Sequence, residues 1–392
     1  MKEDFDALRP ETFDSPHDEY RRLRAECPVA HSDAWGGFWG LFRHCDVAAA
    51  AADSATFITS VQNVVPKVAF TGRRPPLHLD PPEHTPYRRA LAPLLTEKHV
   101  ERYRDTTRRI SAELVDAMKE RGGGDICADF SSRMPIRVFA HWMNLEDEEI
   151  GPLAEVGSRY NIAVQSNDGQ ATKETSLALY AMARDLVARR KQHPLDPALD
   201  ATSALLATKV DGKPLPEEMI VGTIRQVLVV GIIAPTVLIG AIVVHLARDL
   251  NLQERLRREP ALIPAAIEEF LRLYTPYRGF ARTAVRDVEI CGRTIPAGEP
   301  IALVYASANR DESVFDDPES FRLNRPNMKD SVAFGRGPHM CVGAALARLE
   351  LVVALEELLG RTTAIRLEGE PVQTRFPEIG ALKVPVTLIA GI

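Results

Sequence analysis

The chain has 392 residues, of which 45% are hydrophobic and 26% charged, with a formal net charge of -6. This composition is ordinary for a globular protein. Because no Lys/Arg-dense block stands out, it argues against a nucleic-acid partner and favours a small-molecule ligand. The five cysteines form no Cys-x-x-Cys pair, so they indicate a reducing compartment rather than a disulfide framework.

The N-terminal segment Met1–Asp6 is acidic and lacks an apolar core, so it predicts neither a signal peptide nor a membrane anchor. We therefore expect a cytoplasmic protein. No repeat, low-complexity tract or long Gly/Ser linker marks a boundary, so we expect a single domain over residues 1–392.

Apolar periodicity along the chain predicts a mainly α protein with small β-sheets. Amphipathic patterns predict helices at Pro16–Cys27, Thr96–Glu120, Lys173–His193, Asn251–Glu259, Ile263–Tyr274 and Val342–Leu359. Short β patterns lie at Val285–Ile290, Pro300–Tyr305 and Lys383–Ile389.

Eighteen residues without a charge, Val227–Val244, are long enough to cross a membrane. A helix buried on all sides in a large domain gives the same signal. Gly231, Pro235 and Gly240 interrupt the run, and charged residues flank it. We favour the buried helix and expect no membrane partner.

Cys341 is the residue with the clearest chemical signal. A helical pattern follows it at once, and a cysteine at a helix N-terminus ionises more easily than a free one. Gly335 and Gly337 permit a tight turn against a flat object, and Phe334 could shield the sulfur from water. These features indicate a metal-ligating thiolate. A buried structural cysteine and a dinucleotide-binding loop are the alternatives, although Met340 stands where such a loop needs its third glycine.

Residues 334–343 read Phe-Gly-Arg-Gly-Pro-His-Met-Cys-Val-Gly and fill every fixed position of the pattern Phe-Gly-x-Gly-x-His-x-Cys-x-Gly. This stretch resembles the haem-binding signature of the cytochrome P450 family. The resemblance implies the cytochrome P450 fold and haem b, with Cys341 as the axial thiolate and Phe334 and Gly335 in the haem-binding loop.

The implied reaction is monooxygenation of a small hydrophobic or aromatic substrate by dioxygen. Electrons would come from NAD(P)H through a ferredoxin and its reductase or through a flavin/iron–sulfur reductase. By family analogy the pocket would be lined by five segments: Phe57–Phe70, Tyr160–Gln165, Val229–Ala234, Tyr277–Phe280 and Phe376–Leu382.

Haem carries two propionates, which need cations. His84 and Arg88 lie four residues apart, on one face of a helix if one begins near the preceding prolines. The resemblance assigns these two residues, together with Arg282 and His339, to the propionates. Taken singly, each would more often be a solvated charge or a satisfied histidine.

Glu269 and Arg272 are spaced for a helical ion pair. The family keeps such a pair, joined by a later arginine, in a buried structural network. Arg325 occupies the later position here, and Asn309–Asp311 also fits the family pattern. We expect the three to support the haem loop rather than to act in catalysis.

The apolar helix departs from the family. The usual motif of the family places an acid and an alcohol in the central helix, where they relay protons for cleavage of the O–O bond. Aligned on Gly231, these positions hold Ile233 and Ala234, and Pro235 follows. Thr236 is the nearest hydroxyl, either a tentative proton donor or a group bonded back to a carbonyl inside the helix.

The variant segment Gly231–Thr236, taken with the later stretch Tyr274–Phe280, resembles the haem domain of self-sufficient bacterial members that carry a fused reductase. The missing acid–alcohol pair leaves a peroxide-driven peroxygenase as a second function, and a non-enzymatic haem sensor as a third.

Overall fold

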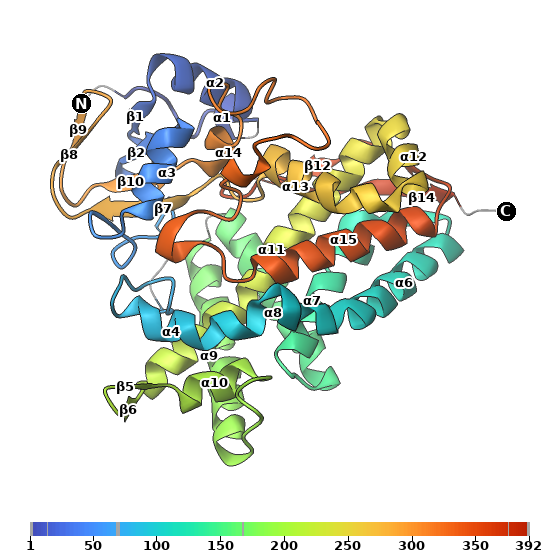
Figure 1. Ribbon diagram of the computed structural model, residues 1–392, viewed down its shortest axis with the longest axis horizontal. Helices are drawn as coiled ribbons and strands as arrows, with labels where there is room; N and C mark the ends of the chain where they lie inside the picture. The colour runs from blue at the N-terminus through green and yellow to red at the C-terminus, as the bar shows by residue number, and fades with distance from the viewer. Residues whose placement is uncertain (1–2, 14, 68–70, 167, 375, 390–392) are drawn as a thin grey trace.

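Helices form most of the protein, and the largest β-sheet lies at one end with the N-terminus (Figure 1). The computed structural model describes residues 3–13, 15–67, 71–166, 168–374 and 376–389. Its α-helices are α1 (Pro10–Phe13), α2 (His17–Glu26), α3 (His44–Ala52), α4 (His84–Leu91), α5 (Glu97–Val100), α6 (Arg104–Glu120), α7 (Met134–Trp142), α8 (Asp147–Gln165), α9 (Gly169–Gln192), α10 (Ala201–Ala207), α11 (Glu217–Arg248), α12 (Leu250–Arg258), α13 (Ile263–Tyr274), α14 (Tyr305–Ala308) and α15 (Ala344–Gly360).

The strands form one five-stranded sheet and four smaller ones. They are β1 (Val29–Ser32), β2 (Phe38–Leu41), β3 (Phe57–Ile58), β4 (Gly123–Asp125), β5 (Lys209–Val210), β6 (Lys213–Pro214), β7 (Phe280–Ala284), β8 (Val288–Ile290), β9 (Arg293–Ile295), β10 (Pro300–Leu303), β11 (Ala364–Leu367), β12 (Val372–Gln373), β13 (Ala381–Lys383) and β14 (Pro385–Ile389). The largest sheet has the order β1-β2-β10-β7-β3, with Ile301 of β10 paired to Trp39 of β2 and to Arg282 of β7.

Five of the six predicted helices are confirmed as single helices, with ends that differ by at most four residues. The sixth, Thr96–Glu120, is divided by a 3-10 turn at Glu101–Tyr103. Thr96 caps the first part, since its hydroxyl accepts a hydrogen bond from the His99 N–H at 3.3 Å. Periodicity did not reveal the break because a single 3-10 turn shifts the apolar positions very little.

The predicted strands were less accurate than the helices. Pro300–Tyr305 contains β10 but ends in α14, and Val285–Ile290 contains only β8. The strand before it, β7, was missed. Four of its five residues are buried, so β7 lacks the alternation that identifies a half-exposed strand.

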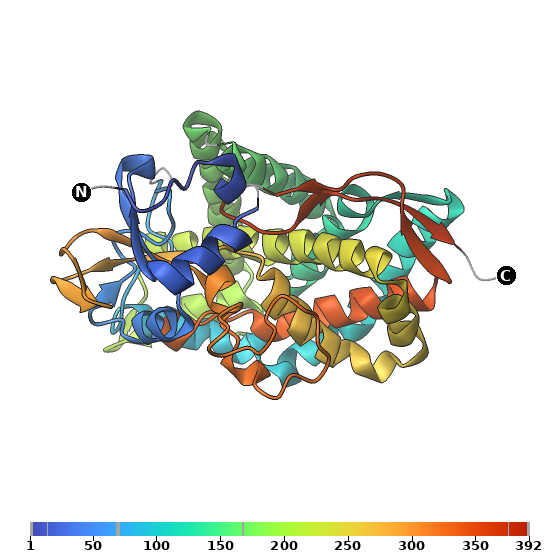
Figure 2. The same cartoon turned by 90° about the horizontal axis from the view of Figure 1, so that it is seen from above.

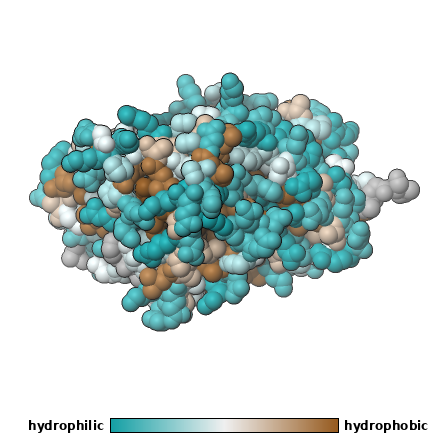
Figure 3. All heavy atoms as spheres, turned by 90° about the horizontal axis from the view of Figure 1, so that it is seen from below, coloured by the Kyte–Doolittle hydropathy of each residue, from teal (hydrophilic) through white to brown (hydrophobic). Residues whose placement is uncertain are grey.

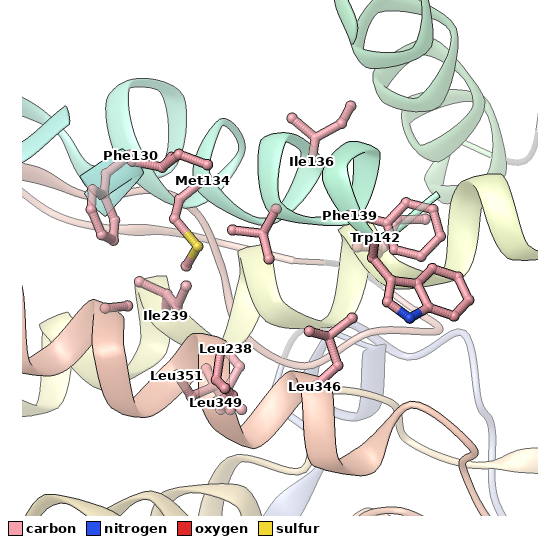
Figure 4. Close-up of a cluster of buried hydrophobic side chains, with 14 of the residues drawn as sticks. Phe130, Met134, Ile136, Phe139, Trp142, Leu238, Ile239, Leu346, Leu349 and Leu351 are labelled. Carbon is pink, nitrogen blue, oxygen red and sulfur yellow. The ribbon is translucent and has the colours of Figure 1, made fainter. Parts of the chain in front are cut away.

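The apolar run Val227–Val244 lies within α11, which passes through the middle of the helical region (Figure 2). Of the described residues, α11 alone is long and apolar enough to cross a membrane, and 71% of its most apolar stretch is buried. Figure 4 shows it between α7 and α15, with labelled side chains Met134, Phe139, Leu238, Ile239, Leu346 and Leu349. The face in Figure 3 is mostly hydrophilic, with apolar side chains in separate patches. Packing of α11 against the rest of the protein therefore accounts for its apolar composition.

One acid, Glu350 of α15, is buried in this core. Burial raises the pKa of Glu350 well above its ordinary value, and its Oε1 has no hydrogen-bond partner among the described residues. The folded protein therefore holds a proton that the unfolded chain releases above pH ~4.3. It follows that this group lowers stability as pH rises, by up to about 1.4 kcal/mol per pH unit until the folded-state pKa is reached.

We expect Glu350→Gln to be more stable than the unmodified protein at pH 8, with a difference that shrinks towards pH 5. Urea denaturation at several pH values measures this difference. Glu370→Gln is the control, because the Glu370 side chain is 96% exposed and should give no pH-dependent difference. A difference for Glu350→Gln that stays constant between pH 5 and 8 would contradict the argument.

Candidate active site

Cys341 lies on a closed loop between a 3-10 turn (Gly337–His339) and the start of α15. The Cys341 N–H donates to the Phe334 carbonyl at 2.8 Å and so closes the loop. Gly335 and Gly337 have φ angles of 72° and 73°, the left-handed region that favours glycine. A Cβ on Gly337 would also lie 2.5 Å from the Ala51 carbonyl oxygen, so only glycine fits there.

Cys341 has exposed surface, but protein atoms closely surround its sulfur. Burial raises the pKa of Cys341 above its ordinary value, although a hydrogen bond from the Gly343 backbone and the charges of Arg88 and Arg348 act in the opposite direction. The backbone at the helix start therefore acts in the direction expected from sequence, but burial has the larger effect. A bound cation would supply the remaining stabilisation, because metal binding displaces the thiol proton.

Phe334 is held in the loop by a cation–π contact. The Arg348 guanidinium lies 4.5 Å from the centre of its ring, and Arg348 is itself fixed by Glu268 at 2.6 Å. This arrangement holds the aromatic ring in the loop that carries Cys341.

The four residues predicted to hold propionates come together from three parts of the chain. His84 and Arg88 lie on α4, Arg282 on β7 and His339 on the 3-10 turn before Cys341. The rings of His84 and His339 are 4.6 Å apart. Burial, His339 and Arg88 lower the pKa of His84 to about 4, and Arg282 acts on His339 in the same sense. The site is therefore a cluster of cations and neutral histidines.

These residues fit an anionic cofactor group. Neither Arg88 nor buried Arg282 forms an ion pair with a carboxylate within the described part of the chain; Arg282 donates to the Ala281 carbonyl at 2.8 Å and to the Tyr305 hydroxyl. His84 Nε2 is buried and has no hydrogen-bond partner among the described residues. A buried cation without an acid costs several kcal/mol, and two propionates would remove that cost.

His339 differs from the other three, because it already has partners. Its Nε2 lies 3.8 Å from the Asp80 carboxylate and 3.4 Å from the Thr59 hydroxyl. Burial lowers the pKa of His339 despite Asp80. The Asp80 contact ties the Cys341 loop to the segment before α4.

Glu269, Arg272 and Arg325 form the expected buried network. Glu269 accepts from Arg272 at 2.8 Å and from Arg325 at 2.7 Å, and all three side chains are buried. Arg272 also donates to the backbone carbonyl of Asn309, whose side-chain oxygen accepts from the Val332 N–H at 2.8 Å. The network therefore reaches the loop that carries Cys341, as a structural support.

The middle of α11 carries one exposed side chain. Between Ile220 and Val244 its described side chains are buried or half-buried, except that of Val230, which is 46% exposed. Ala234 lies one turn further on and is half-buried. The Thr236 hydroxyl donates to the Ser131 carbonyl at 2.8 Å, across to a short π-helix (Cys127–Ser131). This bond adds to the two arrangements expected from sequence, and sequence alone could not have found it.

Three of the five segments predicted to line the pocket run side by side. Tyr277 pairs with Glu378, the Arg278 N–H donates to the Pro377 carbonyl, and the Ala281 N–H donates to the Asn63 carbonyl. Tyr277 and Phe280 are in aromatic contact, with their ring centres 5.3 Å apart. Residues 68–70 of the first predicted segment lie outside the described residues.

Comparison with known proteins decides the family. A profile of the cytochrome P450 family matches residues 163–388. The chain is a cytochrome P450. It is 32% identical over 389 residues to cytochrome P450 107B1 of Saccharopolyspora erythraea, covering 94% of each chain, and 34% identical over 317 residues to the mycinamicin IV hydroxylase/epoxidase of Micromonospora griseorubida, covering 80% of this chain and 78% of the relative.

The structure of the P450 agrees with this assignment. The solved cytochrome P450 CYP109Q5 from Chondromyces apiculatus superposes with a TM-score of 0.88 and 27% identity, over 99% of this chain and 98% of that one. The predicted mainly α cytochrome P450 fold, the haem b cofactor and the assignment as a haem-thiolate monooxygenase are confirmed. The resemblance to reductase-fused members is not supported: the relatives are ordinary P450s, and the match to cytochrome P450 107B1 spans 94% of that relative.

Proposed function

We propose that this P450 inserts one oxygen atom of dioxygen into a small hydrophobic or aromatic substrate, by hydroxylation or oxidative dealkylation. The proposal rests on the convergence of His84, Arg88 and Arg282 beside the Cys341 loop. Two of these side chains are cations and one is a neutral histidine, and none has an acid partner among the described residues. Thiolate-ligated haem, when bound, supplies the oxygen-activating chemistry. The second oxygen atom leaves as water, which requires two electrons and two protons.

Each residue has a defined part in this proposal. Cys341 ligates the iron, while His84, Arg88, Arg282 and His339 hold the propionates. Phe334 keeps water from the sulfur, and Gly335 gives the loop its turn. The apolar and aromatic side chains around Tyr277 and Phe280 exclude water from the substrate.

Electrons would come from NAD(P)H through a separate ferredoxin and ferredoxin reductase, or through a flavin/iron–sulfur reductase. We assign the whole of residues 1–392 to one catalytic domain in the cytoplasm. A screen of small aromatic and aliphatic compounds for a substrate-dependent spin shift, followed by product analysis with NADPH and surrogate redox partners, tests the assignment. Absence of any spin shift and of any oxygenated product would favour the haem sensor.

A peroxide-driven peroxygenase is the second candidate, because Ile233 and Ala234 occupy the acid and alcohol positions of α11. Turnover supported by hydrogen peroxide is compared with turnover supported by NADPH and redox partners. Faster turnover with peroxide would select this alternative.

We propose Thr236 for proton delivery, since it is the nearest hydroxyl to those positions. Thr236→Ala is expected to increase the fraction of electrons lost as hydrogen peroxide, whereas Thr236→Ser, which keeps the hydroxyl, should remain coupled. Peroxide and product are measured per NADPH consumed. Unchanged coupling in Thr236→Ala, with lower thermal stability, would instead assign the hydroxyl to the Ser131 contact alone.

A further inference from the structure

Two buried arginines lie beside each other at the N-terminal half of α11. Arg225 belongs to that helix, and Arg74 belongs to the segment that packs on it. Arg225 has no exposed surface and Arg74 is 8% exposed. Both donate to the side-chain oxygen of Gln226, at 3.4 Å from Arg74 and 3.5 Å from Arg225. The Arg225 charge lowers the pKa of Arg74, in addition to the larger effect of burial. Both guanidinium groups nevertheless stay charged.

These two arginines are exceptional among the buried ones. Nine arginines are buried in the described part of the chain. Five pair with carboxylates: Arg24, Arg190, Arg272, Arg310 and Arg325. Arg278 donates to the Thr12 carbonyl, and Arg282 belongs to the propionate cluster. Arg74 and Arg225 remain, and neither forms an ion pair with an acid among the described residues.

The partners that they do have are neutral. Arg225 donates to the Ser176 hydroxyl at 2.8 Å, and Arg74 Nη2 lies 3.0 Å from His78 Nε2. Burial and the two arginines lower the pKa of His78 to about 3, so that His78 carries no charge at neutral pH. The Nε of each arginine is buried without a hydrogen-bond partner among the described residues. Burying two adjacent cations whose partners are all neutral costs folding free energy.

Tyr160 is the closest substitute for an anion. The Arg225 guanidinium lies 4.7 Å from the centre of its ring, and its hydroxyl bonds to both arginines. Although burial would raise the pKa of Tyr160, the charges of Arg225 and Arg74 lower it below the ordinary value. The cluster therefore stabilises negative charge on an oxygen placed between the two guanidinium groups.

The position of Arg74 is fixed by close packing. A Cβ on Gly222 of α11 would lie 2.0 Å from the Arg73 carbonyl oxygen, so glycine lets this segment lie directly on the helix. The Tyr180 hydroxyl of α9 donates to the same carbonyl at 3.2 Å. Close packing on α11 and the Tyr180 bond therefore fix the segment that carries Arg74 beside Arg225.

Gln226, which accepts from both arginines, lies on the face of α11 that continues towards Ala234. Gln226, Val230 and Ala234 are spaced four residues apart and lie on one face of the helix, and Val230 is the exposed residue of that face. Burial, together with Glu378, Tyr160 and Cys341, raises the pKa of Tyr277 well above its ordinary value. Gln226 and Ala234 are about 12 Å apart along the helix at 1.5 Å per residue. An anion held at the cluster would therefore lie about 12 Å along α11 from Ala234.

We propose that Arg74 and Arg225 bind the carboxylate of the substrate, with Tyr160 as a neutral third donor, so that the substrates are small organic acids oxidised at the apolar end. This inference rests on the proposed function, whose substrate class it narrows. Arginine suits the role because its planar fork matches a carboxylate. The spacing along α11 suits a para-alkylbenzoate, one aromatic ring with a short chain.

The first test needs no variant. 4-Butylbenzoate and 4-butylbenzamide have the same apolar body, so their dissociation constants, measured with the holoenzyme at pH 7.5 by equilibrium dialysis and spin-shift titration, isolate the charge. We expect the acid to bind at least tenfold more tightly, since a hydrogen bond to a charged group contributes about 1.5–3 kcal/mol. Equal affinities would overturn the proposal.

The second test assigns the preference to residues. Arg225→Gln and Arg74→Gln should each weaken benzoate binding about tenfold and leave amide binding within threefold, while Arg225→Lys should restore part of the loss. Arg184→Gln is the matched control: Arg184 lies 5.8 Å from the Tyr180 ring but pairs with Glu218 at the surface. A preference for the acid that survives both glutamine variants would refute the assignment.

The two proposals fail separately. If the holoenzyme prefers the acid but oxidises neither ligand, the proposed monooxygenation fails and the carboxylate site stands. If it oxidises apolar compounds without any preference for acids, the carboxylate site fails and the monooxygenase stands.

Discussion

Replacement of Cys341 by histidine is expected to abolish the strongly red-shifted Soret band of the reduced carbonyl complex. That shift requires a thiolate ligand, which donates electron density to the iron. Histidine retains a ligand atom but not the charge, so the variant should give a histidine-type spectrum and lose monooxygenase activity. Difference spectra of the dithionite-reduced, carbon monoxide-saturated protein make the measurement.

The exposed cysteine Cys45 provides the control for this experiment. Cys45→Ser should keep the red-shifted band at full intensity. A histidine-type spectrum in the unmodified protein, or a red-shifted band in Cys341→His, would show that another residue ligates the iron.

Glu269→Gln is expected to cause the largest loss of stability. The substitution keeps the shape of the side chain but leaves Arg272 and Arg325 buried without a counter-charge, which costs about 3–5 kcal/mol. Because Arg272 reaches Val332 through Asn309, the loss should extend to the Cys341 loop and lower haem content. Urea denaturation and the ratio of haem to protein absorbance give the two readouts.

The neighbouring residue supplies a matched control. Glu268 also pairs with an arginine, Arg348, but that pair is 32% and 39% exposed. Glu268→Gln should therefore cost no more than about 1 kcal/mol. Equal losses in the two variants would mean that burial does not determine the contribution of these pairs.

Much of the haem side could be predicted from sequence, because its chemistry is concentrated in short segments. The loop around Cys341 depends on glycines and on the helix that follows, all within the residues 334–343. Helical spacing places His84 and Arg88 on one face, and the resemblance implied their role at the propionates. Arg282 was harder, since β7 is buried and shows no alternation, and its assignment came only from the resemblance.

The structure around α11, on the other side of the site from Cys341, could not be predicted from sequence in the same way. Arg74 and Arg225 resemble ordinary surface charges in the sequence, and only the tertiary structure shows that both are buried without an acid. The contact of Thr236 with Ser131 likewise joins residues that are far apart in the chain. No periodic pattern records such contacts, because each depends on how distant segments of the chain pack.

The pairing of β2, β10 and β7 has a consequence for the order of assembly. Arg282 lies in an interior strand whose neighbour β10 also pairs with β2, more than 250 residues away in sequence. Contacts between such distant segments form slowly, since a long loop must close first. The Cys341 loop and α15 are local and can form early. Haem capture should therefore begin at the thiolate and become tight only when the sheet closes.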